Sequence, residues 1–143
     1  MEADRKAKVL ETLNEIVELE LSGAVRYTQY SLMIFGHARI PIIGWMQEQA
    51  DEALAHARQA GEEVTTLGDR PSLGIGALVG THHERIDAIL EELIEHESRG
   101  VELYRKLLGL VEDESVELEE YARGMIRAEE LHVAEIRKML RAH

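Results

Sequence analysis

The sequence predicts an all-α protein, an antiparallel four-helix bundle in which a long crossover joins the second helix to the third. Leu, Glu, Ala and Arg dominate the 143 residues, and there are only two prolines, which is a helix-forming composition. Apolar residues recur with the helical period in four segments of similar length. A stretch containing Gly and Pro separates the middle two segments, and it is longer than a connection between antiparallel neighbours needs.

The first two helices are predicted from about residue 5 to about residue 34 and from about residue 42 to about residue 67. Gly36 and Pro41 mark the break between them. The apolar stripe of the first helix consists of Val9, Leu13, Ile16, Val17, Ala24, Tyr27, Ser31 and Ile34. The stripe of the second consists of Ile43, Met46, Ala50, Ala53, Ala57, Ala60 and Val64.

The crossover is predicted at residues 68–76, and two further helices follow it. The third opens at residues 81–84, Thr-His-His-Glu, where the Thr and Glu are spaced as in a capping box. The fourth starts near residues 113–115. The stripe of the third helix is Ile86, Leu90, Leu93, Val101, Tyr104 and Leu108, and that of the fourth is Leu118, Ala122, Met125, Ile136 and Met139. We expect residues 1–143 to form one domain.

The composition excludes several classes of function. The chain has no cysteine, which removes disulfides, zinc ribbons, iron–sulfur clusters and thiol catalysis. A net charge of −12 argues against nucleic acid as a partner, because phosphate binding needs a basic face. No apolar run approaches the roughly 20 residues that span a bilayer, and the N-terminus has no apolar signal core. We therefore expect no membrane partner and a cytoplasmic location.

Charged residues interrupt three of the apolar stripes near the middle of each helix. Glu20 interrupts the first, Glu97 the third, and Glu129 and His132 continue the register of the fourth. An ionised carboxylate buried without a partner costs several kcal/mol, and no matching set of Arg or Lys lies on these faces. A pair of divalent cations would supply the missing positive charge. Carboxylate and imidazole ligands suit iron or manganese, and they do not exclude zinc.

The two halves of the chain repeat this pattern. Glu20 precedes His56 by 36 residues, and Glu97 precedes His132 by 35. Two helix–helix units that each contribute to one central site would have such spacing. Each residue taken alone is more often a solvated boundary residue. The combination of four helices, matched spacings and inward register is what predicts the metal site.

Tyrosines repeat in the same way, because Tyr27 and Tyr104 each lie seven residues after the glutamate of their half. Tyr27 could hydrogen-bond a ligand or donate an electron, or it could be a buried tyrosine with a satisfied hydroxyl. Trp45 and the methionines are interpreted as core residues. The remaining histidines are interpreted as loop, cap or surface residues: His37, His82, His83, His96 and His143.

Two motifs resemble a known family. Residues 13–21, Leu-Asn-Glu-Ile-Val-Glu-Leu-Glu-Leu, followed by Tyr27, are similar to the first-helix signature of bacterioferritins. Residues 128–132, Ala-Glu-Glu-Leu-His, match their fourth-helix Glu-x-x-His, and Glu97 matches their third-helix ligand. The chain therefore resembles the bacterioferritin and rubrerythrin branch of the ferritin-like superfamily over nearly its whole length. The resemblance implies an iron site with Tyr27 beside it.

The second helix departs from the family pattern at two positions. The family carries Glu-x-x-His there, but Ala53 lies three residues before His56, and the nearest carboxylate is Glu52, four residues before it. Residues three and four apart share a helix face, so Glu52 could still reach a metal, with or without a one-residue bulge. Alternatively, Glu52 is solvated and the site lacks one bridging ligand. Leu54 replaces the methionine that binds haem in bacterioferritins, so we predict no haem there.

The resemblance implies a di-iron carboxylate protein that binds ferrous iron and oxidises it with dioxygen or peroxide, for iron storage or detoxification. One iron would be held by Glu20 and His56 and the other by Glu97 and His132. The bridging candidates are Glu129 and Glu52. Two alternatives stay open: a non-catalytic metal-binding bundle with an altered site, and a rubrerythrin-like enzyme that reduces peroxide. It is therefore open at this point whether the protein is an enzyme.

Apolar residues also lie off the main stripe of the first helix and at the start of the second. They are Leu19, Leu21, Leu32 and Ile40. Because a single bundle seldom exposes so much apolar surface, we expect a homodimer or a higher homo-oligomer through the first two helices.

Overall fold

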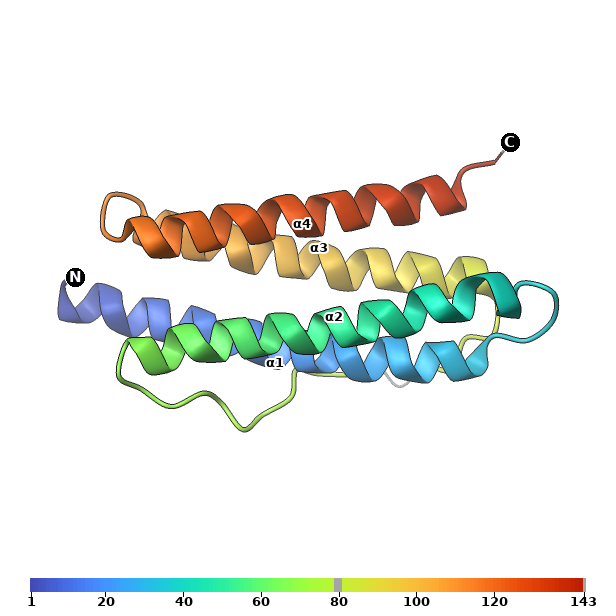
Figure 1. The fold of residues 1–143 in the computed structure, drawn as a ribbon, viewed down its shortest axis with the longest axis horizontal. Helices are drawn as coiled ribbons and strands as arrows, with labels where there is room; N and C mark the ends of the chain where they lie inside the picture. The colour runs from blue at the N-terminus through green and yellow to red at the C-terminus, as the bar shows by residue number, and fades with distance from the viewer. Residues whose placement is uncertain (79–80, 143) are drawn as a thin grey trace.

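The computed structural model describes residues 1–78 and 81–142, which form four long helices (Figure 1). The helices are α1 (Ala3–Met33), α2 (Arg39–Thr66), α3 (Ile86–Val111) and α4 (Val116–Leu140). The helices α1 and α2 form one antiparallel pair, α3 and α4 form the other, and α1 also contacts α3. The chain between the pairs returns along the length of the bundle, so the predicted all-α bundle with a long crossover is confirmed.

The connection between α3 and α4 is tight and well capped. Asp113 has a left-handed backbone with φ 63°, which lets the chain reverse within a few residues. The Ser115 side chain then accepts a hydrogen bond from the Leu118 N–H at 3.2 Å, which satisfies a free donor in the first turn of α4. The predicted start of the fourth helix is confirmed. In its last turn, Arg137 and Lys138 complement the negative end of the helix dipole.

The helix α2 begins three residues earlier than predicted, at Arg39, and Pro41 lies inside its first turn. Proline is tolerated there because the first turn of a helix has no partner for its N–H groups. Gly36, with φ 83°, turns the chain between the helices. The Arg39 guanidinium reaches back and donates to the Ile34 carbonyl at 2.9 Å, which satisfies the end of α1.

The predicted capping box at residues 81–84 is wrong, since α3 begins only at Ile86 and no side chain caps it. Instead, the Thr81 hydroxyl hydrogen-bonds to Glu92, which lies one to two turns into α3. The hydroxyl is 2.9 Å from each of the two carboxylate oxygens of Glu92. Arg26 of α1 pairs with the same carboxylate and donates to the Thr81 hydroxyl at 2.8 Å. A mostly buried ion pair between α1 and α3 thus binds Thr81 and holds the end of the crossover against the bundle.

The crossover is fixed along α1 by backbone and side-chain hydrogen bonds. Ser72 donates through its N–H to Asn14 at 2.7 Å and through its hydroxyl to Glu18 at 2.6 Å. The Gly76 N–H donates to the Glu18 carbonyl at 2.8 Å. A Cβ at Gly76 would lie only 3.0 Å from that carbonyl oxygen, so the close approach requires glycine.

Two apolar clusters fill the bundle, one on each side of a polar layer at its middle. The first, at the end that holds the α3–α4 turn, contains Val9, Leu13, Ile16, Val17, Ala60, Val64, Tyr104, Leu107, Val111, Leu118, Ala122 and Met125. The second, at the opposite end, contains Tyr27, Tyr30, Ile34, Ile42, Met46, Ala50, Ile89, Leu90, Leu93 and Ile136. Met139, expected on the stripe of the fourth helix, is 39% exposed because it lies one residue before α4 ends.

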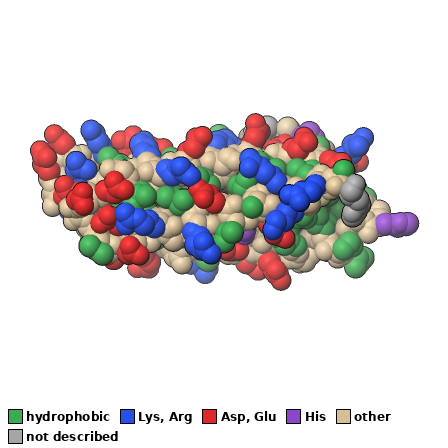
Figure 2. Space-filling view, turned by 90° about the horizontal axis from the view of Figure 1, so that it is seen from above, with side chains coloured by type: hydrophobic (Ala, Val, Ile, Leu, Met, Phe, Trp, Pro, Cys, Tyr) green, Lys and Arg blue, Asp and Glu red, His purple; other side chains and the backbone are tan. Residues whose placement is uncertain are grey.

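Acidic and basic side chains are interspersed over the face of the bundle in Figure 2, with hydrophobic side chains gathered near one end. Leu32 and Ile40 are exposed, at 61% and 83%. Leu19 and Leu21 are only half-buried, not exposed as expected, because they also pack inward on their neighbours. The homo-oligomer stays a prediction. In the described residues, no helix is long and apolar enough to cross a membrane, and the cytoplasmic location also stays a prediction.

A repulsive pair at one end of the bundle makes stability depend on pH. Burial and the facing carboxylate of Glu117 raise the pKa of Glu63 from 4.5 to about 7. The folded state therefore holds a proton that the unfolded chain releases, and this stabilisation is present below about pH 4.5 and lost as the pH rises through about 7. We expect Glu63→Gln to raise the free energy of unfolding at about pH 8 by less than about 1 kcal/mol, since solvent screens the pair.

At about pH 4 the same substitution should have little effect, because Glu63 is then protonated in both states. Urea unfolding at the two pH values measures the difference, and Glu62→Gln, on the exposed face of the same helix, is the control. An equal gain at both pH values would show that repulsion between the carboxylates is not the cause.

Candidate metal centre

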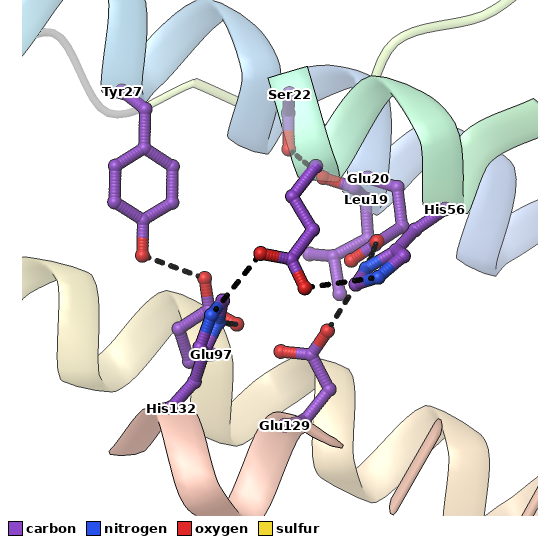
Figure 3. A network of polar contacts seen from close by, with 9 residues as sticks. Leu19, Glu20, Ser22, Tyr27, His56, Glu97, Glu129 and His132 are labelled. Carbon is purple, nitrogen blue, oxygen red and sulfur yellow. Dashed lines mark hydrogen bonds and ion pairs between the residues drawn. The ribbon is translucent and has the colours of Figure 1, made fainter. Parts of the chain in front are cut away.

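Each helix contributes a buried charged or imidazole side chain to the polar layer (Figure 3). Glu20 comes from α1, His56 from α2, Glu97 from α3 and Glu129 from α4, and their exposed fractions are 4%, 8%, 6% and 1%. The helical period brings them here, since each lies one turn or two from apolar residues of the same buried face. His132 follows Glu129 by one turn and lies at the edge of the layer, with its side chain 22% exposed.

The first group of ligand atoms consists of Glu20, His56 and Glu129. The His56 Nδ1 atom lies 2.8 Å from Glu20 Oε2 and 3.2 Å from Glu129 Oε1. Glu20 Oε2 is thus in close ion-pair contact with the imidazole, although it has no partner among the described residues that meets the full hydrogen-bond geometry. The three donor atoms lie within 4.8 Å of one another, which is the arrangement expected of ligands that face a common point.

The second group consists of Glu97, Glu129 and His132, whose donor atoms also lie within 4.8 Å of one another. The His132 Nδ1 atom is 3.9 Å from Glu97 Oε2. The other oxygen of Glu97 accepts a hydrogen bond of 2.7 Å from the Tyr27 hydroxyl, which points down from α1 (Figure 3). Glu129 belongs to both groups, so one carboxylate stands between two potential metal positions.

Glu52 lies between the two histidines on the solvent side of the layer. Its carboxylate oxygens are 3.6 Å from His56 Nε2 and 3.5 Å from His132 Nε2, and its side chain is 43% exposed. The helix α2 is a regular α-helix from Arg39 to Thr66, so the four-residue spacing brings Glu52 to the layer without a bulge. We refer to Glu20, Glu52, His56, Glu97, Glu129 and His132 together as the carboxylate–histidine centre.

Added positive charge would stabilise the buried carboxylates of the centre. In the described part of the chain, no Lys or Arg pairs with its buried carboxylates. Burial and the adjacent Glu97 raise the pKa of Glu129 to about 10. Burial also acts to raise the pKa of Glu97, but the neighbouring Glu129 carboxyl and His132 imidazole outweigh it and hold that pKa at about 2. Without a metal, the two carboxyls therefore share one proton.

His56 also holds a proton in this state. Burial lowers its pKa, but the carboxylates of Glu129 and Glu20 outweigh burial and raise it to about 10. Protons thus occupy the positions where cations would be most stable, and metal ions would displace them. Carboxylate oxygens and imidazole nitrogens, with one shared carboxylate, are the donor set of a site for two divalent ions of the iron or manganese type. The residues present therefore fit a pair of such metals.

The structure brings all six predicted metal ligands together, and it places Tyr27 against one of them. The prediction that His96 lies at the surface is wrong, since it is only 7% exposed. Its Nε2 atom lies 2.6 Å from the position that a Cβ on Gly23 would take, so only glycine leaves room for the ring. The helical period could have found it, because His96 continues the buried stripe of Ile89, Leu93, Gly100 and Tyr104.

The other histidines match their predicted positions where the structure describes them. His37 and His82 are exposed, and His83 lies 3.1 Å from Glu92 near the crossover. His143 lies outside the described residues. Leu54 is 38% exposed, and the prediction that no haem binds there stays a prediction.

Comparisons with known proteins agree with this architecture. A family model for the ferritin-like domain matches residues 10–142. A ferritin-like diiron-carboxylate protein from Bacillus anthracis is similar with a TM-score of 0.90 and 22% identity, over 99% of this chain and 100% of that one. The bacterioferritin of Desulfovibrio desulfuricans is similar with a TM-score of 0.83 and 25% identity, over 96% of this chain and 80% of that one. It is described with its diiron site in different catalytic states. Dps from Thermosynechococcus elongatus is similar with a TM-score of 0.90 and 14% identity, over 98% of this chain and 94% of that one. No curated protein sequence matches the chain.

The centre predicts that metal binding and stability are coupled. We expect anaerobic ferrous iron or manganese to raise the melting temperature, with about 2.7 kcal/mol of added stability at about 100 times Kd. Glu129→Gln should remove most of this gain, because it alters the shared ligand. The metal-free variant should be at least as stable as the parent near neutral pH, since the amide is neutral without the proton that Glu129 must take up on folding.

Thermal unfolding with and without metal measures both effects. Glu120→Gln, on the exposed face of α4, is the matched control and should keep the full gain. If Glu129→Gln retained the metal-induced gain, the shared carboxylate would not be a ligand.

Proposed function

The chain belongs to the ferritin-like family, and from this premise we propose that it is a ferroxidase, which binds ferrous iron at the carboxylate–histidine centre and oxidises it for storage or detoxification. The observation that carries the proposal is the shared position of Glu129 between two groups that each have their own histidine. A site with one group would bind a single ion, whereas two groups with a common carboxylate hold two ions side by side. The described diiron site of the Desulfovibrio bacterioferritin supports the choice of iron.

In this proposal each half of the chain supplies the ligands of one iron. Glu20 and His56, from the α1–α2 pair, hold one iron. Glu97 and His132, from the α3–α4 pair, hold the other. Glu129 would be shared by the two ions from inside the bundle. Glu52 would bind from the solvent side, where its carboxylate oxygens lie 3.6 Å from His56 Nε2 and 3.5 Å from His132 Nε2.

Two ferrous ions supply two electrons at once, one from each ion. With dioxygen and two protons they give two ferric ions and hydrogen peroxide, and with hydrogen peroxide and two protons they give two ferric ions and two waters. Fixed ligands hold the ions close together and leave positions for the oxidant. The protein thereby avoids a one-electron step that would release a radical oxygen species.

The surrounding residues have separate tasks in this scheme. The Tyr27 hydroxyl holds one oxygen of Glu97, which leaves the other oxygen of that carboxylate free for a metal. Glu52 is the only exposed carboxylate among the described ligands, so we place the entry of ferrous iron past it. We also propose that the exposed Leu32 and Ile40 pair with a second copy of the chain in a homo-oligomer.

An anaerobic titration of the metal-free protein with ferrous iron, followed by air, tests the function. We expect saturation at about two irons per chain and oxidation faster than in buffer alone. Glu52→Ala should weaken binding of the ion pair by at least about tenfold and slow oxidation, because it removes a ligand. Glu48→Ala, on the exposed face of α2, is the control.

Two outcomes would contradict the proposal. Saturation at about one iron per chain would mean that the centre does not hold a pair. Oxidation no faster than in buffer would mean a non-catalytic metal-binding bundle. A rate with peroxide far above that with dioxygen would instead assign the protein to peroxide reduction.

A further inference from the structure

A cavity of about 220 Å³ lies between α1, α3 and the end of the crossover. Apolar side chains of α3 and the crossover form part of its wall. Its polar wall comes from two helices, with Arg26 and Tyr30 on α1 and with Glu92, His96 and Arg99 on α3. None of the six proposed metal ligands lines it, so its chemistry is separate from that of the centre. A concave space with apolar walls and a few polar groups is the usual form of a small-ligand site.

Arg26 extends from α1 to the cavity with N–H donors to spare. Its side chain is only 11% exposed, and its guanidinium group lies over the Tyr30 ring, 4.9 Å from the centroid. The Nη2 atom donates to the Thr81 hydroxyl and to Glu92. The donors on Nη1 and Nε have no partner in the described part of the chain. Guanidinium donors in this fixed geometry suit the oxygens of an anion.

Tyr30 adds a buried hydroxyl to the same wall. The residue is 0% exposed, and its hydroxyl lies near Glu92 and Thr81. No described residue meets the full geometry of a hydrogen bond to it. A buried hydroxyl without a good partner destabilises a core, and phenylalanine would fill the same space. A ligand in the cavity would supply the missing partner.

His96 indicates the sign of the charge that the cavity favours. It is 7% exposed, and burial is the main cause of its lowered pKa. Glu97 opposes this effect, whereas the charges of Arg99 and Arg26 add to it. Two exposed charged residues line the cavity, and of these Arg99 influences His96 while Glu95 does not. The surroundings of the ring therefore favour an anion.

Glu92 is the acceptor of the cavity. Its two carboxylate oxygens each lie 2.9 Å from the Thr81 hydroxyl, and His83 Nε2 lies 3.1 Å from one of them. Burial acts to raise the pKa of Glu92, but the nearby Tyr30, Thr81 and Arg26 outweigh it and lower that pKa. The carboxylate is therefore ionised. Because the threonine hydroxyl has a single proton, it donates to only one oxygen at a time, and the carboxylate can accept a further hydrogen bond.

We propose that this cavity binds a protonated oxyanion of the size of inorganic phosphate. The negative oxygens of the anion accept hydrogen bonds from Arg26, Tyr30 and His96. Hydrogen phosphate keeps at least one proton at neutral pH, and its O–H group donates to Glu92. Sulfate has the same shape but no proton at this pH, so the ionised carboxylate repels it.

A ligand at this place joins three elements of the fold. Arg26 and Glu92 already link α1 to α3, and Thr81 holds the end of the crossover to both of them. An anion bound to the same side chains strengthens this attachment and stabilises the folded chain. The inference goes beyond the proposed function and does not depend on it, because binding requires no metal.

The test titrates the full, metal-free chain with inorganic phosphate at constant ionic strength, and calorimetry records the heat of binding. Without iron, phosphate cannot bind to ferric ions instead. We expect saturation at about one phosphate per chain, a higher melting temperature with phosphate, and binding of sulfate at least about tenfold weaker.

Two variants locate the site. Tyr30→Phe should weaken phosphate binding about tenfold, because it removes a donor to a charged ligand. Arg99→Gln should weaken it about threefold and reduce its salt dependence, because an exposed charge acts through solvent. The matched controls are Tyr104→Phe, another buried tyrosine, and Arg127→Gln, an exposed arginine on α4, and both should bind as the parent does. Melting of each variant without phosphate checks its folding.

Three results would overturn the proposal. The first is the absence of saturable binding with a Kd below about 1 mM. The second is binding of sulfate as tight as that of phosphate. The third is unchanged binding in both Tyr30→Phe and Arg99→Gln, which would place the phosphate elsewhere on the chain. Oxidation of ferrous iron is measured separately, so each of these results leaves the ferroxidase proposal standing.

Discussion

The structure depends on negative charge placed in the middle of a bundle with no cation to balance it. Glu20, Glu97 and Glu129 are almost fully buried, and in the described residues no Lys or Arg reaches them. In the metal-free state the charge is reduced by protons, one shared between Glu97 and Glu129 and one held by His56. A layer of this kind divides the apolar core into two clusters, and it is stable only because protons or metal ions can occupy it.

The topology explains how the layer is assembled. Two helix pairs each bring a glutamate and a histidine, and the crossover lets the second pair lie against the first in the orientation that makes their middles coincide. The bonds from Ser72 and Gly76 to α1 hold the crossover in place, and Thr81 with Glu92 and Arg26 fixes its end. The centre therefore relies on residues far from it, since a shift of one pair along the other would separate the ligands.

The same layer shows where function opposes stability. Apolar residues at the buried carboxylate positions would pack without any charge to compensate. Each of these positions departs from what a stable core favours, and all of them lie at the centre. Such departures indicate function more reliably than the composition of the surface does.

The sequence by itself determined the four helices, the crossover and the inward face of Glu20, Glu97, Glu129 and His132, because the helical period relates spacing along the chain to a shared face. It also identified His56 by its matched spacing. It left open whether Glu52 could reach the layer, placed His96 at the surface, and assigned Thr81 to a capping box. Those questions were decided only by the tertiary structure, which sets the distances between helices: the position of Glu52 between two histidines, the space that Gly23 leaves for His96, and the ion pair that captures Thr81. A periodic pattern specifies the direction of a side chain on its own helix, whereas its partners come from other helices whose positions no local pattern records.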